Sequence, residues 1–423
     1  MIDLKLFSKL QKGDTAFLLL SPDDPGKLRY YLMSVSVNYS IVAAGECEGE
    51  LPRDELVGFD VSLSSIIPLL DKGKQFTVSF DGEILRFNDV NGRYNIEPLC
   101  VQNDSQLSKD VAKKYTTFIE AYNNYVSSAS EEEEISQRLV AQEYEYQQAR
   151  IMSLSGGASS DPFTDIDPVK AVEERYIPKL QQTRDRLSTI RDRMQGIAEI
   201  DLHAFKNLAT VASKFNQIVS MCGQYSIVSL ATCYVLQKAE SPILAMQGKL
   251  LRHLLLDTKG KFYSWGEEIV FCTNTVGKKG NKETTVVFLS RYLPSVAVDD
   301  TIITRGVVEE QYVFKLKPLM DVVLPCLGKF SDMSFDMGNS RVELRNDQGE
   351  KLTYDFELES QDSIYVRKAR RGLIDVSEIT IATVNIPREV QTILYLFGDK
   401  LTMHVKRNKV VLQSDSLYVV FGR

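Results

Sequence analysis

Residue types that support catalysis are present in this sequence, but their spacing fits no reaction. Three histidines stand isolated from one another: His203, His253 and His404. Residues 276–283, VGKKGNKE, have the glycines and lysines of a phosphate loop without its GxxxxGK[ST] spacing, which favours a basic hairpin tip. Three aspartates lack the glycine and terminal glutamate of a calcium loop: Asp161, Asp165 and Asp167. We therefore expect a protein that is not an enzyme and that binds no cofactor or metal.

Composition indicates a folded chain of ordinary type. With 43% hydrophobic and 25% charged residues, the 423 residues suit two to four globular domains. The six cysteines show no CxxC or other metal-ligand spacing, so we expect reduced structural thiols. The net charge of −7 means that a polyanion would need a local basic surface. Neither a signal sequence nor an apolar run of membrane-spanning length is evident, so we expect no membrane association and a cytoplasmic location.

The positions of apolar residues repeat along the chain. A short helix with apolar i, i+3, i+4 spacing, followed by three short strands, occurs six times. The six expected helices span residues 4–12, 62–72, 202–215, 246–257, 316–329 and a last segment starting near 386. The interval of about 140 residues between the second and third helices breaks the rhythm, which predicts an insertion there.

The predicted insertion spans residues 105–195 and is helical. Apolar residues follow a 4-3-4-3-4 step, which is typical of a coiled-coil seam: Val111, Tyr115, Phe118, Tyr122, Tyr125 and Ala129. Ser128 and Ser130, followed by EEEE, predict that this helix breaks and restarts. Residues 153–168 form the expected reversal, and a second amphipathic run follows, which Pro178 should kink or start. An antiparallel helical hairpin or a three-helix bundle is predicted.

Isolated units of this size leave open strand edges, which must be paired or covered. Pairing unit to unit gives domains, and pairing domains gives a curved sheet with all helices on one side. We therefore expect an α+β fold of repeated β-α-β-β-β units. The domain boundaries are placed at 1–104, 105–195 for the helical insertion, 196–298 and 299–423.

Two stretches carry a resemblance to a known family: FDVSLSSIIPLLDKGKQFTVSFDGEILRFNDVNGRYNI and VFKLKPLMDVVLPCLGKFSDMSFDMGNSRVELRNDQGEKLTYDF. They resemble the DNA sliding clamp family, the processivity factors of replicative polymerases. The resemblance covers residues 1–104 and 196–423 and implies three clamp domains, with a two-subunit ring of twelve helices. The helical insertion is not part of the usual clamp, and a divergent viral or phage member would fit.

If the helices line a DNA channel, as the resemblance implies, their exposed faces should carry cations. Such residues would contact phosphates without reading bases. The expected DNA-binding residues are Lys5, Lys9, Lys12, Lys72, Lys74, Lys206, Lys214, Lys249, Arg252, Lys259, Lys315, Lys317, Lys329, Arg388 and Lys400. The alternative is that these are ordinary lysines on the wet faces of amphipathic helices.

The family also implies a pocket for partner peptides on the last domain. We expect it beside the basic run RKARRG at 367–372 and the closing strand, which should form an apolar edge. Its expected residues are Arg367, Lys368, Leu417, Val419 and Phe421. A solvated linker is the alternative interpretation of the basic run.

The sequence thus favours a sliding-clamp processivity factor that encircles duplex DNA as a homodimeric ring and tethers a DNA polymerase, with a clamp loader as a further partner. Two alternatives remain: a clamp-fold adaptor that recruits RNA polymerase through the helical insertion, and a structural protein that binds no nucleic acid. The insertion would then serve as a docking arm, a dimerisation element or a spacer.

Overall fold

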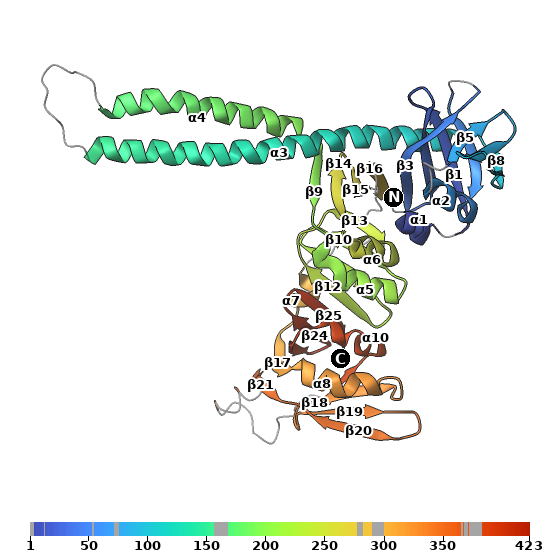
Figure 1. The fold of residues 1–423 in the computed structure, drawn as a ribbon. Coiled ribbons are helices and arrows are strands. Elements are labelled where there is room, and N and C mark those ends of the chain that lie inside the picture. Colours follow the sequence, from blue (N-terminus) through green and yellow to red (C-terminus); the bar gives the residue numbers. More distant parts are fainter. Residues whose placement is uncertain are drawn as a thin grey trace, which may run out of the picture. The chain divides into compact units, whose positions relative to one another are not determined.

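The computed structural model describes residues 4–11, 13–52, 55–71, 76–155, 168–276, 282–289, 300–364, 367, 371 and 383–423. The chain forms two compact units (Figure 1). The first combines Met1–Ile200 with Lys259–Leu289, and the second combines Asp201–Thr258 with Ser290–Arg423. In the part of the chain that the structure describes, no helix is both long and apolar enough to cross a membrane.

The first unit is built on a large, mostly antiparallel sheet. Its repeats contain α1 (Leu4–Leu10), β1 (Thr15–Pro22), β2 (Lys27–Val35), β3 (Tyr39–Glu50), β4 (Val57–Ser62), α2 (Leu63–Asp71), β5 (Phe76–Phe80), β6 (Leu85–Asp89), β7 (Asn95–Ile96) and β8 (Cys100–Gln102). After the insertion come β9 (Ile197–Ile200), β14 (Gly260–Trp265), β15 (Glu268–Val276) and β16 (Lys282–Leu289). The strand order is β8-β4-β1-β2-β3-β16-β15-β14-β9, and β5 joins β3 in parallel and carries β6 and β7.

The second unit contains a nine-stranded and a four-stranded sheet. Its first part comprises η1 (His203–Phe205), α5 (Lys206–Lys214), β10 (Ile218–Cys222), β11 (Tyr225–Ser229), β12 (Cys233–Lys238), β13 (Ile243–Gln247) and α6 (Gly248–Leu256). Its second part comprises α7 (Thr301–Thr304), β17 (Val308–Lys315), α8 (Leu316–Val323), η2 (Leu324–Cys326), β18 (Asp332–Asp336), β19 (Arg341–Arg345), β20 (Lys351–Asp355), β21 (Leu358–Ser363), β22 (Thr383–Ile386), α10 (Arg388–Gln391), η4 (Leu394–Leu396), β23 (Lys400–Lys406), β24 (Lys409–Ser414) and β25 (Leu417–Gly422). The sheet orders are β13-β10-β11-β12-β25-β24-β23-β17-β21 and β20-β19-β18-β22.

Strand pairing confirms the predicted sixfold repetition. The helices α1, α2, α5, α6, α8 and α10 are each followed by a short run of strands. The strand before the second helix of each repeat pair joins the first strand after the first helix, as in β4 with β1, β13 with β10 and β22 with β18. The reciprocal pairing also occurs, in β9 with β14 and β17 with β23. Equivalent segments therefore form equivalent contacts.

Sheet continuity crosses the predicted domain boundaries. The pair β3–β16 extends the sheet of the first unit, and the pair β12–β25 extends that of the second. The predicted domain boundaries follow the repeats and stay a prediction. The two compact units follow the continuous sheets instead.

Close packing of two repeat helices depends on a glycine. The helices α5 and α6 pack against each other in the second unit. A Cβ added at Gly248 would lie 2.3 Å from the Cβ of Ala212, far inside van der Waals contact. Both helices turn their apolar residues inward, and Leu208, Leu251 and Leu254 are fully buried. Their opposite sides are left to solvent.

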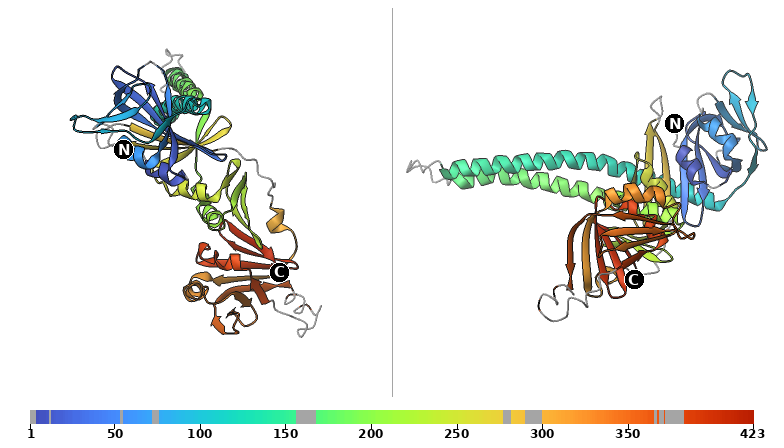
Figure 2. Two further views of the ribbon diagram at one scale, coloured as in Figure 1. Left: turned by 90° about the vertical axis from the view of Figure 1, so that its right-hand side faces the viewer. Right: turned by 90° about the horizontal axis from the view of Figure 1, so that it is seen from below.

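The insertion is a hairpin of α3 (Gln106–Ser155) and α4 (Pro168–Arg193), which lie side by side beyond the sheet (Figures 1 and 2). The predicted break at 128–130 is wrong, because α3 runs unbroken through it. The acids expected to start a new helix instead pair with α4: Glu131 with Arg186 at 2.7 Å and Glu132 with Arg191 at 2.9 Å. Helix α4 begins at Pro168, where the missing N–H costs nothing, and it continues through Pro178.

The Tyr-rich seam of α3 was predicted as a coiled-coil contact, and this is wrong. Its residues pack on the sheet of the first unit: Val111, Tyr115, Phe118, Tyr122 and Tyr125. The sheet supplies Tyr31, Val42, Tyr263 and Phe288, from strands on both sides of the β3–β16 pair. Lys114 adds an ion pair to Glu268, with Nζ 2.6 Å from the carboxylate oxygen. Helix α3 therefore covers a sheet face that would otherwise expose aromatic residues to water.

Candidate nucleic-acid interface

Cations occupy equivalent positions at the starts of the repeat helices. Five of the six helices carry one at their first or second residue: Lys5 in α1, Lys206 in α5, Lys249 in α6, Lys317 in α8 and Arg388 in α10. The last four are exposed, and the structure does not describe the side chain of Lys5. Among these five helices only α10 has an acid in its first turn, Glu389.

These positions are unfavourable for the helices themselves. The first turn carries the positive end of the helix dipole, so a cation there costs roughly 0.3–1 kcal/mol where an acid would stabilise. Helices selected for stability alone would carry Asp or Glu at these positions. This unfavourable choice recurs in α1, α6 and α8, whose first turns hold no acid, and it favours a negatively charged ligand outside the protein. In α5 the turn η1 precedes Lys206 and Asp201 accepts the His203 N–H, and in α10 Glu389 shares the first turn.

The pair α5 and α6 carries two of these cations and two further ones. Lys206, Lys214, Lys249 and Arg252 are all exposed, and neither helix contains an acidic residue. The Lys214 ammonium is fixed in place, because Nζ donates a 2.9 Å hydrogen bond to the Thr392 carbonyl and lies 5.7 Å from the centre of the Tyr395 ring. A surface of this kind can bind phosphates by charge and has no arrangement for reading bases.

Other predicted DNA-binding residues lie in less suitable surroundings. Lys315 and Lys400 are at strand ends, not on helices, and they pair with Glu357 at 3.0 Å and with Glu359 at 2.8 Å. Their charge is thus locally offset. Lys329 is exposed beyond η2, and Lys259 is exposed just before β14. Lys9 is exposed on α1, whereas Lys12, Lys72 and Lys74 lie outside the described residues.

The predicted apolar edge at the closing strand is wrong. Strand β25 is paired on both sides, with β12 and with β24. Leu417, Val419 and Phe421 are at most 5% exposed. An apolar strand that ends a chain was taken for an edge, but here it lies inside the sheet. Of the basic run, Arg367 is exposed and pairs with Asp362 at 3.3 Å, and Lys368 lies outside the described residues.

A groove lies beside β25 that was not predicted from the sequence. The short helix α7 packs Ile302 and Ile303 on a cluster that includes Val411 and Val420. Between α7 and the strands lies a hollow of about 360 Å³, mostly apolar, lined by Tyr234, Ile302 and Val420 among others. A second hollow of about 880 Å³ shares Arg305 and Lys409 with it and adds Arg407 and Val307, a valine that is 73% exposed.

Two lysines hold α7 in place. The Lys406 Nζ is buried and donates to the carbonyls of Ile303, Thr304 and Arg305 at 2.6, 2.9 and 3.3 Å. The Lys409 Nζ donates to the Ile302 carbonyl at 2.6 Å. Burial lowers the pKa of both ammonium groups. Cations at a helix C-terminus satisfy its free carbonyls, so the groove wall is rigidly defined.

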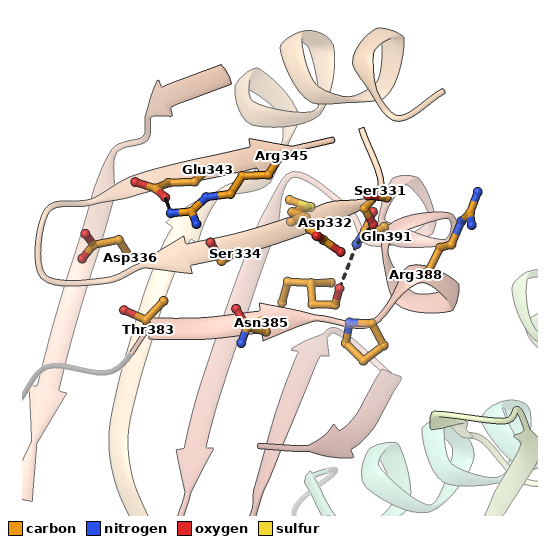
Figure 3. A pocket seen from close by; sticks show the side chains of 13 residues that line it. Ser331, Asp332, Ser334, Asp336, Glu343, Arg345, Thr383, Asn385, Arg388 and Gln391 are labelled. Carbon is orange, nitrogen blue, oxygen red and sulfur yellow. Dashed lines mark hydrogen bonds and ion pairs between the residues drawn. The ribbon is translucent and has the colours of Figure 1, made fainter. Parts of the chain in front are cut away.

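A polar hollow of about 730 Å³ lies on the four-stranded sheet (Figure 3). Asp332, Asp336 and Glu343 are among its lining residues. Glu343 is bonded to Lys351 and, at 2.9 Å, to Arg345, and these bonds lower its pKa. Its charge is therefore already neutralised. Among the described residues, no three His, Cys, Asp or Glu side chains are grouped to hold a metal ion.

The predicted isolation of the histidines can be followed in the structure. They lie on three different elements: His203 on η1, His253 on α6 and His404 on β23. The His404 Nε2 is 3.3 Å from Gln413 Oε1, and burial lowers the pKa of this imidazole.

No protein-family model matches the chain, and no curated protein matches it. Solved structures of bacterial sliding clamps do match. A DNA polymerase sliding clamp from Pseudomonas aeruginosa with ligand aligns with 99% of this chain and 95% of its own, at TM-score 0.54 and 9% identity. The Helicobacter pylori beta clamp bound to DNA ligase peptide aligns over 100% and 97%, at TM-score 0.53 and 7% identity. Caulobacter crescentus pol III beta aligns over 96% and 90%, at TM-score 0.52 and 9% identity. The chain therefore has the sliding-clamp fold, as the repeated units predicted.

Proposed function

We propose that this protein is a sliding clamp that encircles duplex DNA and tethers a replicative polymerase. The observation that carries the proposal is the recurrence of a cation at the first or second residue of five repeat helices, on a clamp fold. The role is non-catalytic, because a clamp acts by topology and contact. Cytoplasmic location, in a host cell if the source is viral, stays an expectation.

A strand-pairing rule within the chain supports ring closure by two copies. The last strand of a first repeat pairs with the last strand of the next domain's second repeat, as in β3–β16 and β12–β25. Two such ends remain open among the described strands: β20, which pairs only with β19, and β7, which pairs only with β6. By the same rule, β20 of one copy would pair with the β7 edge of another, giving a head-to-tail dimer. Such a ring is closed around its circumference, so loading on circular DNA requires a machine that opens it.

Charge reversal at three lysines near the helix starts tests the DNA contacts. In Lys206→Glu, Lys249→Glu and Lys317→Glu together, the slope of log affinity against log salt should fall by about 3, near 0.9 per lost phosphate contact. Lys249→Glu and Lys317→Glu should each raise the free energy of unfolding by roughly 0.3–1 kcal/mol, because acids suit the first turn. Loss of DNA binding without loss of stability would show that these lysines bind DNA and are not ordinary lysines on the solvent-exposed faces of amphipathic helices.

A matched control carries the same charge change on the arm. Arg138, Lys170 and Lys179 are exposed on α3 and α4. The triple change to Glu there should leave the salt slope unchanged. An equal loss of DNA binding in both variants would mean that only total charge matters, and the assignment to the helix starts would be wrong.

We place the partner contact in the groove beside β25. Its apolar part would receive a hydrophobic side chain of a peptide. Arg305 and Arg407 line the groove and form no ion pair with another described residue, so they would attract acidic residues of the same peptide. In primer extension, Val307→Asp together with Arg407→Glu should remove the stimulation of polymerase while DNA retention persists. If the stimulation survives this change, the partner site lies elsewhere, and Arg367 and Lys368, which were predicted from the sequence, become the next residues to test.

A transcription adaptor is the second candidate, favoured by the long α3–α4 hairpin. It predicts that RNA polymerase binding depends on exposed residues of the arm and that a closed ring is unnecessary. Retention of RNA polymerase by the chain, lost on changes in the arm and unaffected by the three helix-start lysines, would favour this function over the first.

A further inference from the structure

The far half of α3 carries an apolar seam that is largely exposed. Val140, Tyr144, Ile151 and Leu154 are 66%, 64%, 58% and 67% exposed. With Gln147 they follow a strict 4-3-4-3 step, the a and d positions of a coiled coil. The seam is roughly 21 Å long at 1.5 Å per residue.

This seam is separate from the one that binds α4. The α4 side is formed by Ile135 and Leu139, which pack with Leu187 and Ile190, and by Tyr146, whose ring lies 6.1 Å from that of Tyr176. At 3.6 residues per turn the two seams are about 130° apart around the helix axis. A helix with two heptad seams is typical of a bundle with more than two members. Within the described residues only one partner, α4, is present.

The charges and polar groups beside the seam suit a second copy of the same helix, running antiparallel. With Val140 opposite Ile151 of the second copy, Tyr144 lies opposite Gln147 of that copy, and each contact occurs twice. The hydroxyl and the amide can then hydrogen-bond at the centre, and a polar residue at one core position fixes register. In this pairing, Val140 and Ile151 would be buried together in two symmetric layers.

The flanking residues agree with the same register. On one side Glu143 meets Arg150 of the second copy, twice. Glu143 is 41% exposed although it also accepts a 2.8 Å hydrogen bond from Arg184, and Arg150 is exposed. On the other side Ala141 meets Gln148 of the second copy, so no like charges face each other. A parallel pair would oppose Gln147 with Gln147 and leave Glu143 and Arg150 without opposite charges.

We propose that the arms of two copies pair antiparallel through this seam, joining two molecules by a contact distinct from the clamp sheets. The pairing goes beyond DNA encirclement and does not depend on it. Four apolar residues per copy make a small interface, so the association is reversible and concentration-dependent.

Cysteine cross-linking of the full chain tests both contact and direction. Copies with Val140→Cys are mixed with copies carrying Ile151→Cys and oxidised with copper phenanthroline, alongside the native chain with its own six cysteines. We expect at least tenfold more cross-linked dimer in the mixture than in either variant alone. Equal cross-linking of each variant with itself would show parallel pairing and overturn the register.

An off-seam pair and an acidic variant complete the design. Glu145→Cys mixed with Ile151→Cys should cross-link no more than the native chain, because Glu145 lies on another face of α3. Val140→Asp with Ile151→Asp should raise the dissociation constant for arm pairing at least 100-fold in sedimentation, with unchanged helical circular dichroism. No excess cross-linking over the off-seam pair would contradict the proposal and assign the seam to a different protein.

Discussion

Truncation of Phe118 in α3 gives a sharp test of how the insertion is anchored. This side chain is fully buried, and its ring centre lies 5.5 Å from that of Trp265, 5.9 Å from Phe288 and 6.0 Å from Tyr122. Replacing a core Phe by Ala costs about 3–5 kcal/mol through lost burial and the cavity left behind. We expect Phe118→Ala to lose that amount from the stability of the first unit.

The chain offers its own probe for this measurement. Trp265 is its single tryptophan and belongs to the first unit, so urea unfolding followed by tryptophan fluorescence reports on that unit. Val126→Ala is the matched control, since Val126 is on the same helix and 46% exposed, and its effect should stay within about 0.5 kcal/mol. A loss below about 1 kcal/mol for Phe118→Ala would refute the packing of α3 on the sheet.

Three further changes test other parts of the account. Gly248→Val should destabilise the second unit by about 1–3 kcal/mol in thermal unfolding, because its side chain would meet Ala212, whereas Lys249→Ala beside it should not destabilise. Thr353→Pro in β20 should shift the mass in solution from dimer to monomer if that edge closes the ring. His404 has a pKa lowered below its unfolded value of 6.5, so its protonation opposes folding; stability should fall as pH drops through 6.5 toward the folded pKa, and less so in His404→Gln.

The repeated units could be predicted because their signals are local. Helix period, strand alternation and turn residues such as Asp81-Gly82 recur in each copy, and strand pairing then follows from the need to close edges. The cations of α5, α6 and α8 were also visible, since exposed positions on an amphipathic helix can be read from its period. Their placement near the helix starts could not be predicted, because the sequence gives the first residue of a helix only to within a few positions.

The errors came from contacts between distant segments. The seam from Val111 to Tyr125 has the same step whether it meets a helix or a sheet, so its burial on Tyr263 and Phe288 could not be foreseen. Strand β25 is apolar because two strands flank it, and a single sequence does not reveal neighbours. Helix α7 spans only Thr301–Thr304, and it depends on Lys406 and Lys409 from about a hundred residues away.

Topological retention tests the central claim most directly. The protein is loaded, with whatever opening machine it requires, on nicked circular duplex DNA, and salt is raised until phosphate contacts are screened. The account predicts that the protein stays on the circle and is released when a single cut makes the DNA linear. Equal release from circular and linear DNA at the same salt would contradict encirclement.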